Sequence, residues 1–293
     1  MKLKLSLKNV AKHVLKLLIV GALFLSGCSY STKPTYLKEN LEESIRDVCK
    51  KEYNINASVT LAGSTLYIYV PMQDIFEKTD KPEKYTEKFQ IDENKTDIQD
   101  QSFVLKYQIK PIPEQEKTQD VKFTKKAIET SSNVWKVLRR VLFSMDRSKE
   151  SEPEFYYLIF ADIKNGIKSE ELIYYLDLKK VSYDFISWGE YQHRSIQKVE
   201  MAPELIGDTT GAKINYKDIT MKDFIAMQIQ NRIKLKFQKP EVSTNANIDN
   251  EIIKIIALTT KIYDFKEFSD AELENLETKG KTLLSRRAIL EKY

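Results

Sequence analysis

The sequence predicts an α+β fold, with a mixed or antiparallel sheet, helices packed on it and a helix-rich C-terminal third. Three patterns predict it: apolar residues that recur every three or four positions, shorter segments that alternate apolar with polar, and one nearly continuous apolar run, Phe155–Ile163. Of the 293 residues 42% are hydrophobic and 11% aromatic, which is enough for a packed core and argues against wholesale disorder.

The first elements are a helix and two strands. An amphipathic helix is expected from Thr35, because its apolar residues recur at helical spacing: Leu37, Leu41, Ile45 and Val48. Residues 57–61 and 65–70 alternate and predict strands joined by a turn at Gly63-Ser64. This alternation places two sets of side chains on opposite faces, Leu66, Ile68 and Val70 on one and Tyr67 and Tyr69 on the other.

A polar middle section follows. Residues 78–100 hold twelve charged side chains among 23, and we expect a solvated excursion with at most a short strand near Phe89. Residues 102–109 alternate again and predict a strand. The segment Pro111–Asp120 has the composition of a linker and is the best internal boundary, dividing residues 35–110 from residues 121–293. A single domain over both regions is the alternative.

The second half begins with the same order of elements. Residues 124–145 predict a helix, Phe155–Ile163 a central strand covered on both faces, and residues 172–176 a return strand after a turn at Asn165-Gly166. Helix, strand, turn and strand therefore occur twice, but without sequence identity, which favours a common arrangement over duplication. Further helices are expected over residues 177–195, 221–232, 249–263 and 269–290, with Thr220 and Ser269 as N-caps and a candidate short strand at 234–237.

Residues 1–27 have the features of a secretory signal peptide. Five lysines lie before Cys28 and no acid does, and Leu17–Leu25 forms a short apolar run followed by Ser26 and Gly27. The alternative is a retained membrane-spanning helix, but spanning needs about 20 apolar residues and the uninterrupted run is much shorter.

Leu25-Ser26-Gly27-Cys28 resembles the lipobox of bacterial lipoproteins. The resemblance covers residues 1–28 and implies that Cys28 becomes the first mature residue, with a thioether-linked diacylglycerol and an acylated amine, such as a palmitoyl amide. Two or three acyl chains anchor a protein firmly. Residues 28–34 would then be a lipidated tether, which holds the folded body close to the membrane. Ser29 is not the aspartate that retains enteric lipoproteins in the inner membrane, and the expected location is the exported side of the cytoplasmic membrane or the outer membrane facing the periplasm.

The positive charge belongs to the leader. The formal net charge is +4, but removing the five leader lysines from the 47 basic residues leaves 42 against 43 acidic ones. The mature chain is therefore nearly neutral, and no nucleic-acid partner is expected. We interpret the basic clusters as solvated faces or contacts with lipid headgroups. These clusters are Arg139-Arg140, Arg286-Arg287 and residues 234–239.

Few residues suggest catalysis. His193 is the only histidine after the leader, which excludes sites that need two, and its surroundings predict an exposed position beside packed aromatic residues. With Cys28 lipidated, Cys49 has no disulfide partner and is expected to be a buried, inert thiol of a helix. Asp162 ends the central strand, where sites often lie, but a polar strand terminus is the favoured interpretation. Gly207–Gly211 lacks the spacing of a phosphate loop and is interpreted as a surface loop.

Two functions remain open. The first is a non-catalytic module that binds or scaffolds an envelope protein or cell-wall partner. The second is an envelope hydrolase that acts on glycan or peptide with a carboxylate pair. With 43 acidic residues in the sequence, many such pairs are possible, and the sequence does not single one out. The first is favoured, because no catalytic constellation, cofactor motif or metal-ligand spacing stands out, and Cys28 is the one modified residue that the sequence predicts.

Overall fold

The structure is a computed structural model that describes residues 41–142 and 153–292. The predicted signal peptide, Cys28 and the tether lie outside these residues. The α+β prediction is confirmed: two mixed sheets and seven helices account for the described architecture, with 35% helix and 39% strand. No helix in the described ranges has both the length and the apolarity to cross a membrane.

The first sheet has five strands in the order β1-β2-β5-β6-β7. Its strands are β1 (Ser58–Ala62), β2 (Thr65–Met72), β5 (Phe155–Asp162), β6 (Ile167–Tyr174) and β7 (Ile196–Met201). β2 and β5 are parallel, and every other neighbouring pair is antiparallel. The predicted central strand is confirmed, because β5 lies between two other strands and is buried along most of its length. β7, at one edge, has no counterpart among the predicted elements.

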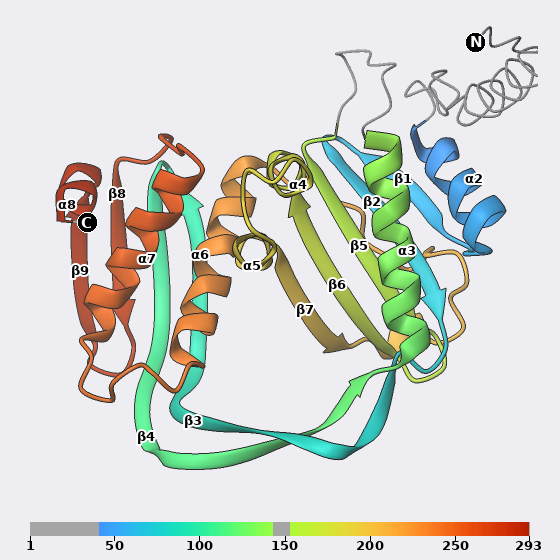
Figure 1. Ribbon diagram of the computed structural model, residues 1–293. Helices are drawn as coiled ribbons and strands as arrows, with labels where there is room; N and C mark the ends of the chain where they lie inside the picture. The colour runs from blue at the N-terminus through green and yellow to red at the C-terminus, as the bar shows by residue number, and fades with distance from the viewer. Residues whose placement is uncertain (1–40, 143–152, 293) are drawn as a thin grey trace, which may run out of the picture.

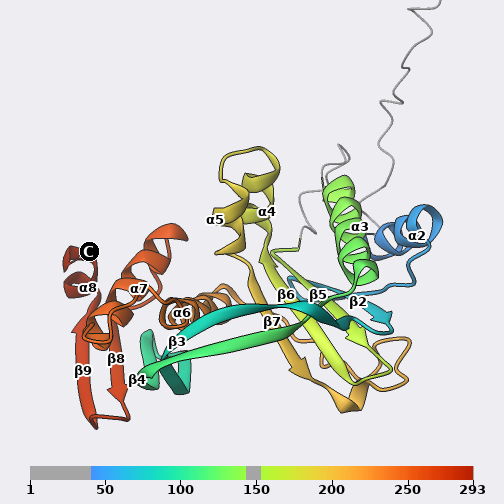
Figure 2. The ribbon, with the colours of Figure 1, turned by 60° about the horizontal axis from the view of Figure 1, so that its bottom comes forward.

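Four helices cover one face of the first sheet (Figures 1 and 2). They are α2 (Leu41–Tyr53), α3 (Lys125–Leu142), α4 (Tyr175–Ser182) and α5 (Trp188–Gln192). The aliphatic side chains of β2 pack beneath them, and Tyr67 and Tyr69 lie on the opposite face, as predicted. The repeated order of helix, strand and strand is also present, as α2-β1-β2 and α3-β5-β6, with the two helices in contact.

A long two-stranded ribbon connects the first sheet to the second (Figure 1). It consists of β3 (Phe76–Gln99) and β4 (Ser102–Phe123). Residues 78–100 are largely solvated, as predicted, but they form a long strand rather than a short one near Phe89, and residues 111–120 continue β4 rather than form an irregular linker. The charged residues face one another across the ribbon, for example in ion pairs of Lys84 with Glu116 at 2.8 Å and Lys117 with Glu87 at 3.0 Å. Alternating charge therefore marks an exposed antiparallel ribbon here rather than a loop.

The second sheet has the order β3-β4-β8-β9. Here the predicted helix over 269–290 is wrong, because β8 (Asp270–Asn275), β9 (Gly280–Ser285) and the short α8 (Arg286–Lys292) occupy it. In β8 the buried Ala271 and Leu273 alternate with more exposed glutamates, which pair with Lys281 and Lys106. This alternation with a period of two is typical of a strand, although Ser269 resembles a helix N-cap. Ser269 instead donates its hydroxyl to the carbonyl of Gln101.

Two long helices pack on the second sheet, α6 (Met221–Phe237) and α7 (Ile248–Ile262). The Thr220 cap of α6 is confirmed, with Asp223 completing a capping box, whereas residues 234–237 continue α6 and form no strand. The helix predicted over 177–195 is broken between α4 and α5. Phe224 of α6 contacts Phe155 of the first sheet at 5.1 Å between ring centroids, so the two sheets share one core.

Candidate functional site

The candidate site is built on the face of the first sheet that the four helices leave open. The parallel register of β2 and β5 places Tyr67 beside Tyr157, and their rings stack with centroids 5.1 Å apart and planes 22° apart. Tyr216, from the long connection between β7 and α6, meets the Tyr67 ring edge-on at 5.1 Å. Strand alternation thus lays a tyrosine surface on this face, which a loop partly covers.

This loop, residues 206–220, is fixed to the sheet by the same tyrosines. The Tyr69 hydroxyl donates to the carbonyl of Asp208 at 2.6 Å, and the Tyr67 hydroxyl donates to the carbonyl of Lys217 at 2.7 Å. Ser64 donates both its amide and its hydroxyl to the Asp218 carboxylate. The loop is therefore a rigid wall of the site.

Gly207–Gly211 was predicted to be a surface loop, and its amide groups already bind a carboxylate of their own chain. Asp208 accepts hydrogen bonds from four backbone N–H groups, those of Thr210, Gly211, Ala212 and Lys213. Burial raises the pKa of Asp208, but these hydrogen bonds outweigh it and hold the pKa below its ordinary value. The loop binds an internal carboxylate and leaves those amides no role toward an external anion.

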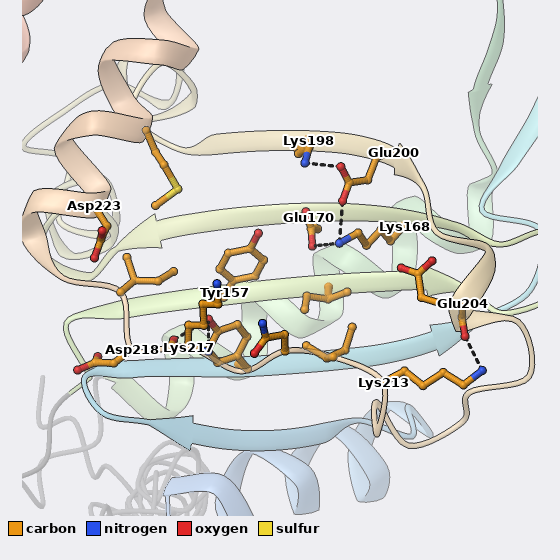
Figure 3. A pocket seen from close by; sticks show the side chains of 16 residues that line it. Tyr157, Lys168, Glu170, Lys198, Glu200, Glu204, Lys213, Lys217, Asp218 and Asp223 are labelled. Carbon is orange, nitrogen blue, oxygen red and sulfur yellow. Dashed lines mark hydrogen bonds and ion pairs between the residues drawn. The ribbon is translucent and has the colours of Figure 1, made fainter. Parts of the chain in front are cut away.

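Next to the tyrosines, β6 and β7 carry a row of paired charges (Figure 3). The Lys168 ammonium contacts Glu170 at 2.7 Å and Glu200 at 2.8 Å, and Lys198 pairs with the same Glu200 carboxylate. The antiparallel register explains the row, because Lys168 pairs with Glu200 and Glu170 with Lys198. Opposite charges directly across two strands stabilise that pairing.

The charges shift one another's ionisation. Burial raises the pKa of Glu200, yet its contacts with Lys168 and Lys198 outweigh burial and lower the pKa below the ordinary value. Burial lowers the pKa of Lys168, but its two glutamate partners raise it above the ordinary value. The pKa of Tyr157 is raised, first by burial and then by the nearby Glu170. The lysine contacts therefore favour the ionised form of Glu200, and burial favours the neutral form of Tyr157.

Two adjoining hollows, about 570 Å³ and about 530 Å³, lie over this row. They share four lining residues, Tyr157, Glu170, Lys198 and Met227, and so form one groove, called the sheet groove below. The first hollow lies between the sheet and the 206–220 loop, and the second extends between β7, β3 and α6.

The second hollow is rich in side-chain amides. Its amide-bearing residues are Asn94, Gln197, Gln230, Asn231 and Gln238. Asn94 donates to the carbonyl of Gln230 at 2.8 Å, whereas its own buried Oδ1 accepts no hydrogen bond. Apolar side chains complete the lining, among them Phe89, Leu172 and Ile196. Such a lining offers both donors and acceptors next to apolar surface, as pockets for polar ligands do.

The residues singled out in the sequence are not brought together. His193 is exposed at the end of α5, as expected, and Cys49 is buried in α2, where burial raises the pKa of its thiol to about 11. Asp162 is buried and accepts hydrogen bonds from the amides of Ile75, Lys164 and Asn165, which is the strand-terminus role that was favoured. The basic clusters lie on different elements, α3, α6 and α8.

Sequence reasoning placed Tyr67 on the groove face but missed the charged residues that line the sheet groove. The signal available was the spacing Lys168-Ser169-Glu170 and Lys198-Val199-Glu200, two polar alternations that match the period of a strand. Among residues 41–142 and 153–292, no three or more metal-ligating side chains gather. Comparisons with protein-family models, curated proteins and solved structures found no match to this chain.

Proposed function

We propose that this chain is a lipid-anchored lipoprotein of the cell envelope whose folded body binds another envelope component without catalysing a reaction. The lipobox-like segment ending at Cys28 supports the anchor. The sheet groove supports the binding function, because it is a long, preformed hollow of mixed polar and apolar character over a rigid sheet.

The observation that carries the proposal is the pairing of the groove carboxylates with lysine. Glu170 and Glu200 both contact Lys168, and the pKa of Glu200 is lowered rather than raised. A carboxylate whose ionised form is favoured by lysine contacts, as that of Glu200 is, can bind polar groups of a ligand but is a poor proton donor.

The lining best suits an extended peptide segment of a partner protein. A peptide backbone presents alternating N–H and C=O groups, and the groove offers amide side chains that can donate to or accept from either. The balanced lysine and glutamate residues favour a ligand without a large net charge.

An envelope hydrolase is the second candidate, and one observation favours it. Glu170 and Glu200 converge on a single ammonium, so the groove does contain facing carboxylates, which that chemistry requires. Its test is hydrolysis of cell-wall glycan and peptide by the purified chain, with Glu170→Gln and Glu200→Gln variants. Activity that both variants lose would replace the binding proposal.

Site-specific photo-crosslinking tests the binding function. A photoreactive amino acid at Met227, which lines both hollows, is expected to capture a discrete partner in the native host. The matched control carries the same group at Leu283, an exposed residue of the second sheet. A Met227 adduct pattern identical to that of Leu283 would contradict the proposal.

The anchor is tested separately. Wild-type chain is expected to incorporate labelled palmitate, to accumulate as a precursor with globomycin, and to fractionate with membranes. Cys28→Ser removes the only thiol that the lipobox resemblance assigns to lipid, and should abolish all three. Normal maturation and fractionation of Cys28→Ser would overturn the placement in the envelope.

A further inference from the structure

A separate hollow, distinct from the two that form the sheet groove, lies on the helix-covered face of the first sheet, between α3 and α5. Its volume is about 360 Å³, and its aromatic lining includes Trp135, Trp188, Tyr191 and Phe160. We call it the tryptophan cleft, because both tryptophans of the chain line it. Phe160, Ser169 and Glu171 line its floor on the face of the sheet opposite the charged row, whereas Glu170 and Gln197 line both this cleft and the sheet groove.

The aromatic rings form a packed wall that still reaches solvent. Trp188 stacks on Tyr191 with centroids 5.2 Å apart and planes 27° apart, and Trp135 meets both rings edge-on. Trp188 nevertheless remains 56% exposed, and Ile128 on the facing helix is 60% exposed. Apolar surface of this size next to a hollow is available to a ligand.

Glu171 lies in this cleft, and no cation of the described residues pairs with it. Its two carboxylate oxygens accept hydrogen bonds from Trp135 Nε1 at 3.3 Å and Gln197 Nε2 at 3.4 Å. No lysine, arginine or histidine of residues 41–142 or 153–292 forms an ion pair with it. Its sequence neighbour Glu170, on the other face of the strand, is paired with Lys168.

The ionisation of Glu171 reflects this difference. Burial raises its pKa, and the hydrogen bonds from Gln197, Trp135 and Ser195 offset that rise only in part. A half-buried carboxylate without a positive partner costs free energy, which a bound cation would recover. Aromatic faces attract cations as well, through the negative potential of the ring.

We propose that the tryptophan cleft binds a ligand bearing a primary ammonium on a short aliphatic or ring body, with the ammonium on Glu171 and the body against Trp188. A primary ammonium carries three N–H donors for the remaining lone pairs of the carboxylate, whereas a quaternary one carries none. The apolar body packs on the indole, as the stem of a lysine side chain does on aromatic surfaces.

Tryptophan fluorescence of the full-length chain in detergent reports this site directly, because no other tryptophan contributes. Titration with Nα-acetyl-lysine amide is expected to change the emission saturably, and the Nε-acetylated analogue, which lacks the charge, is expected not to. Glu171→Gln should weaken binding about tenfold or more, as expected for loss of a charge-assisted hydrogen bond. Glu129→Gln on the exposed side of α3 removes the same charge outside the cleft and should bind as the wild type does.

Ethanolamine phosphate and glucosamine carry the same ammonium on a lipid headgroup and on a sugar. Whichever of these two and the lysine amide binds most tightly identifies the natural ligand as a lipid headgroup, an amino sugar or a lysine side chain. Trp188→Ala gives an independent test, because Trp135 still reports binding and the affinity should fall. Equal responses to the charged and acetylated lysine probes, or unchanged affinity in Glu171→Gln, would overturn the proposal, as would the absence of a response to all three amines.

Discussion

Arg194 and Asp177 form a buried ion pair, with Arg194 Nη1 and Asp177 Oδ1 2.9 Å apart and side chains only 11% and 1% exposed. The pair joins α4 to the turn before β7. Arg194 also contacts Glu190 through Nε at 2.9 Å, and its carbonyl accepts a hydrogen bond from Gln228 of α6. One residue therefore links the helices of the first sheet to α6, which packs on the second sheet.

Arg194→Ala is expected to destabilise the protein by about 3 kcal/mol, because it removes the closer of the two cations that pair with the buried Asp177 carboxylate and leaves only Lys180, 4.0 Å away. Urea unfolding followed by circular dichroism measures the loss. Lys51→Ala, which breaks an exposed ion pair with Asp47, is the control and should leave the unfolding midpoint nearly unchanged. Equal midpoints for both variants would mean that the buried pair has no special role.

Asp162→Asn is expected to cost about 2 kcal/mol at neutral pH, because an amide nitrogen would replace one of the oxygens that accept backbone hydrogen bonds. Burial raises the pKa of Asp162, but its hydrogen bonds outweigh burial and lower the pKa. The folded state therefore binds the proton less tightly than the unfolded state. The stability contribution is complete above the ordinary aspartate pKa of 3.8 and is lost as pH falls through the lowered value.

Urea unfolding at neutral pH and at about pH 3 checks both statements for Asp162. The wild type should lose more stability on acidification than Asp162→Asn does. Asp80→Asn, at an exposed position of the β3–β4 ribbon, is the control and should behave as the wild type at both pH values. If the free energies of unfolding of the wild type and Asp162→Asn differ by the same amount at both pH values, the lowered pKa of Asp162 is contradicted.

Comparing Gly211→Ala with Gly207→Ala separates the cost of backbone strain from the cost of a steric clash of the added Cβ atom. Both glycines have positive φ, 76° and 75°, so alanine strains the backbone at either position. At Gly211 the added Cβ would also lie 2.6 Å from the Tyr216 hydroxyl and 2.9 Å from the Tyr69 ring, whereas at Gly207 it meets no atom within 4 Å. We expect Gly211→Ala to be the more destabilising by about 1–3 kcal/mol, measured by urea unfolding. Equal losses would show that the loop moves freely over the tyrosines.

The sequence pattern predicted the first sheet better than the second. Alternation located β1 and β2, and the apolar run located β5, because burial on one or both faces leaves a clear period. In the ribbon only residues 102–109 carry this signal. Most other side chains of the ribbon face water, and its turn uses Asp100 and Gln101 at positive φ, where glycine or asparagine would have marked a hairpin.

The candidate sites were harder to predict because both depend on contacts between residues that are distant in sequence. Lys168 and Glu200 become neighbours only through the β6–β7 register, and the sequence pattern does not predict β7 as a strand. Trp135 and Trp188 are likewise 53 positions apart in the chain and meet on the surface of a sheet to which neither belongs. Local patterns carry no information about such contacts.

Glu171 makes the stability of the protein depend on pH in the opposite direction to Asp162. Because its pKa is raised, the folded state binds the proton more tightly than the unfolded state does. The contribution of Glu171 to stability is therefore complete below the ordinary glutamate pKa of 4.5 and is lost as the pH rises through the raised value. Glu171→Gln cannot ionise, and its stability relative to the wild type should increase as the pH rises above 4.5, measured by urea unfolding at several pH values. Parallel pH profiles would show that Glu171 ionises as easily in the fold as in water, which would remove the energetic reason for a cation in the tryptophan cleft.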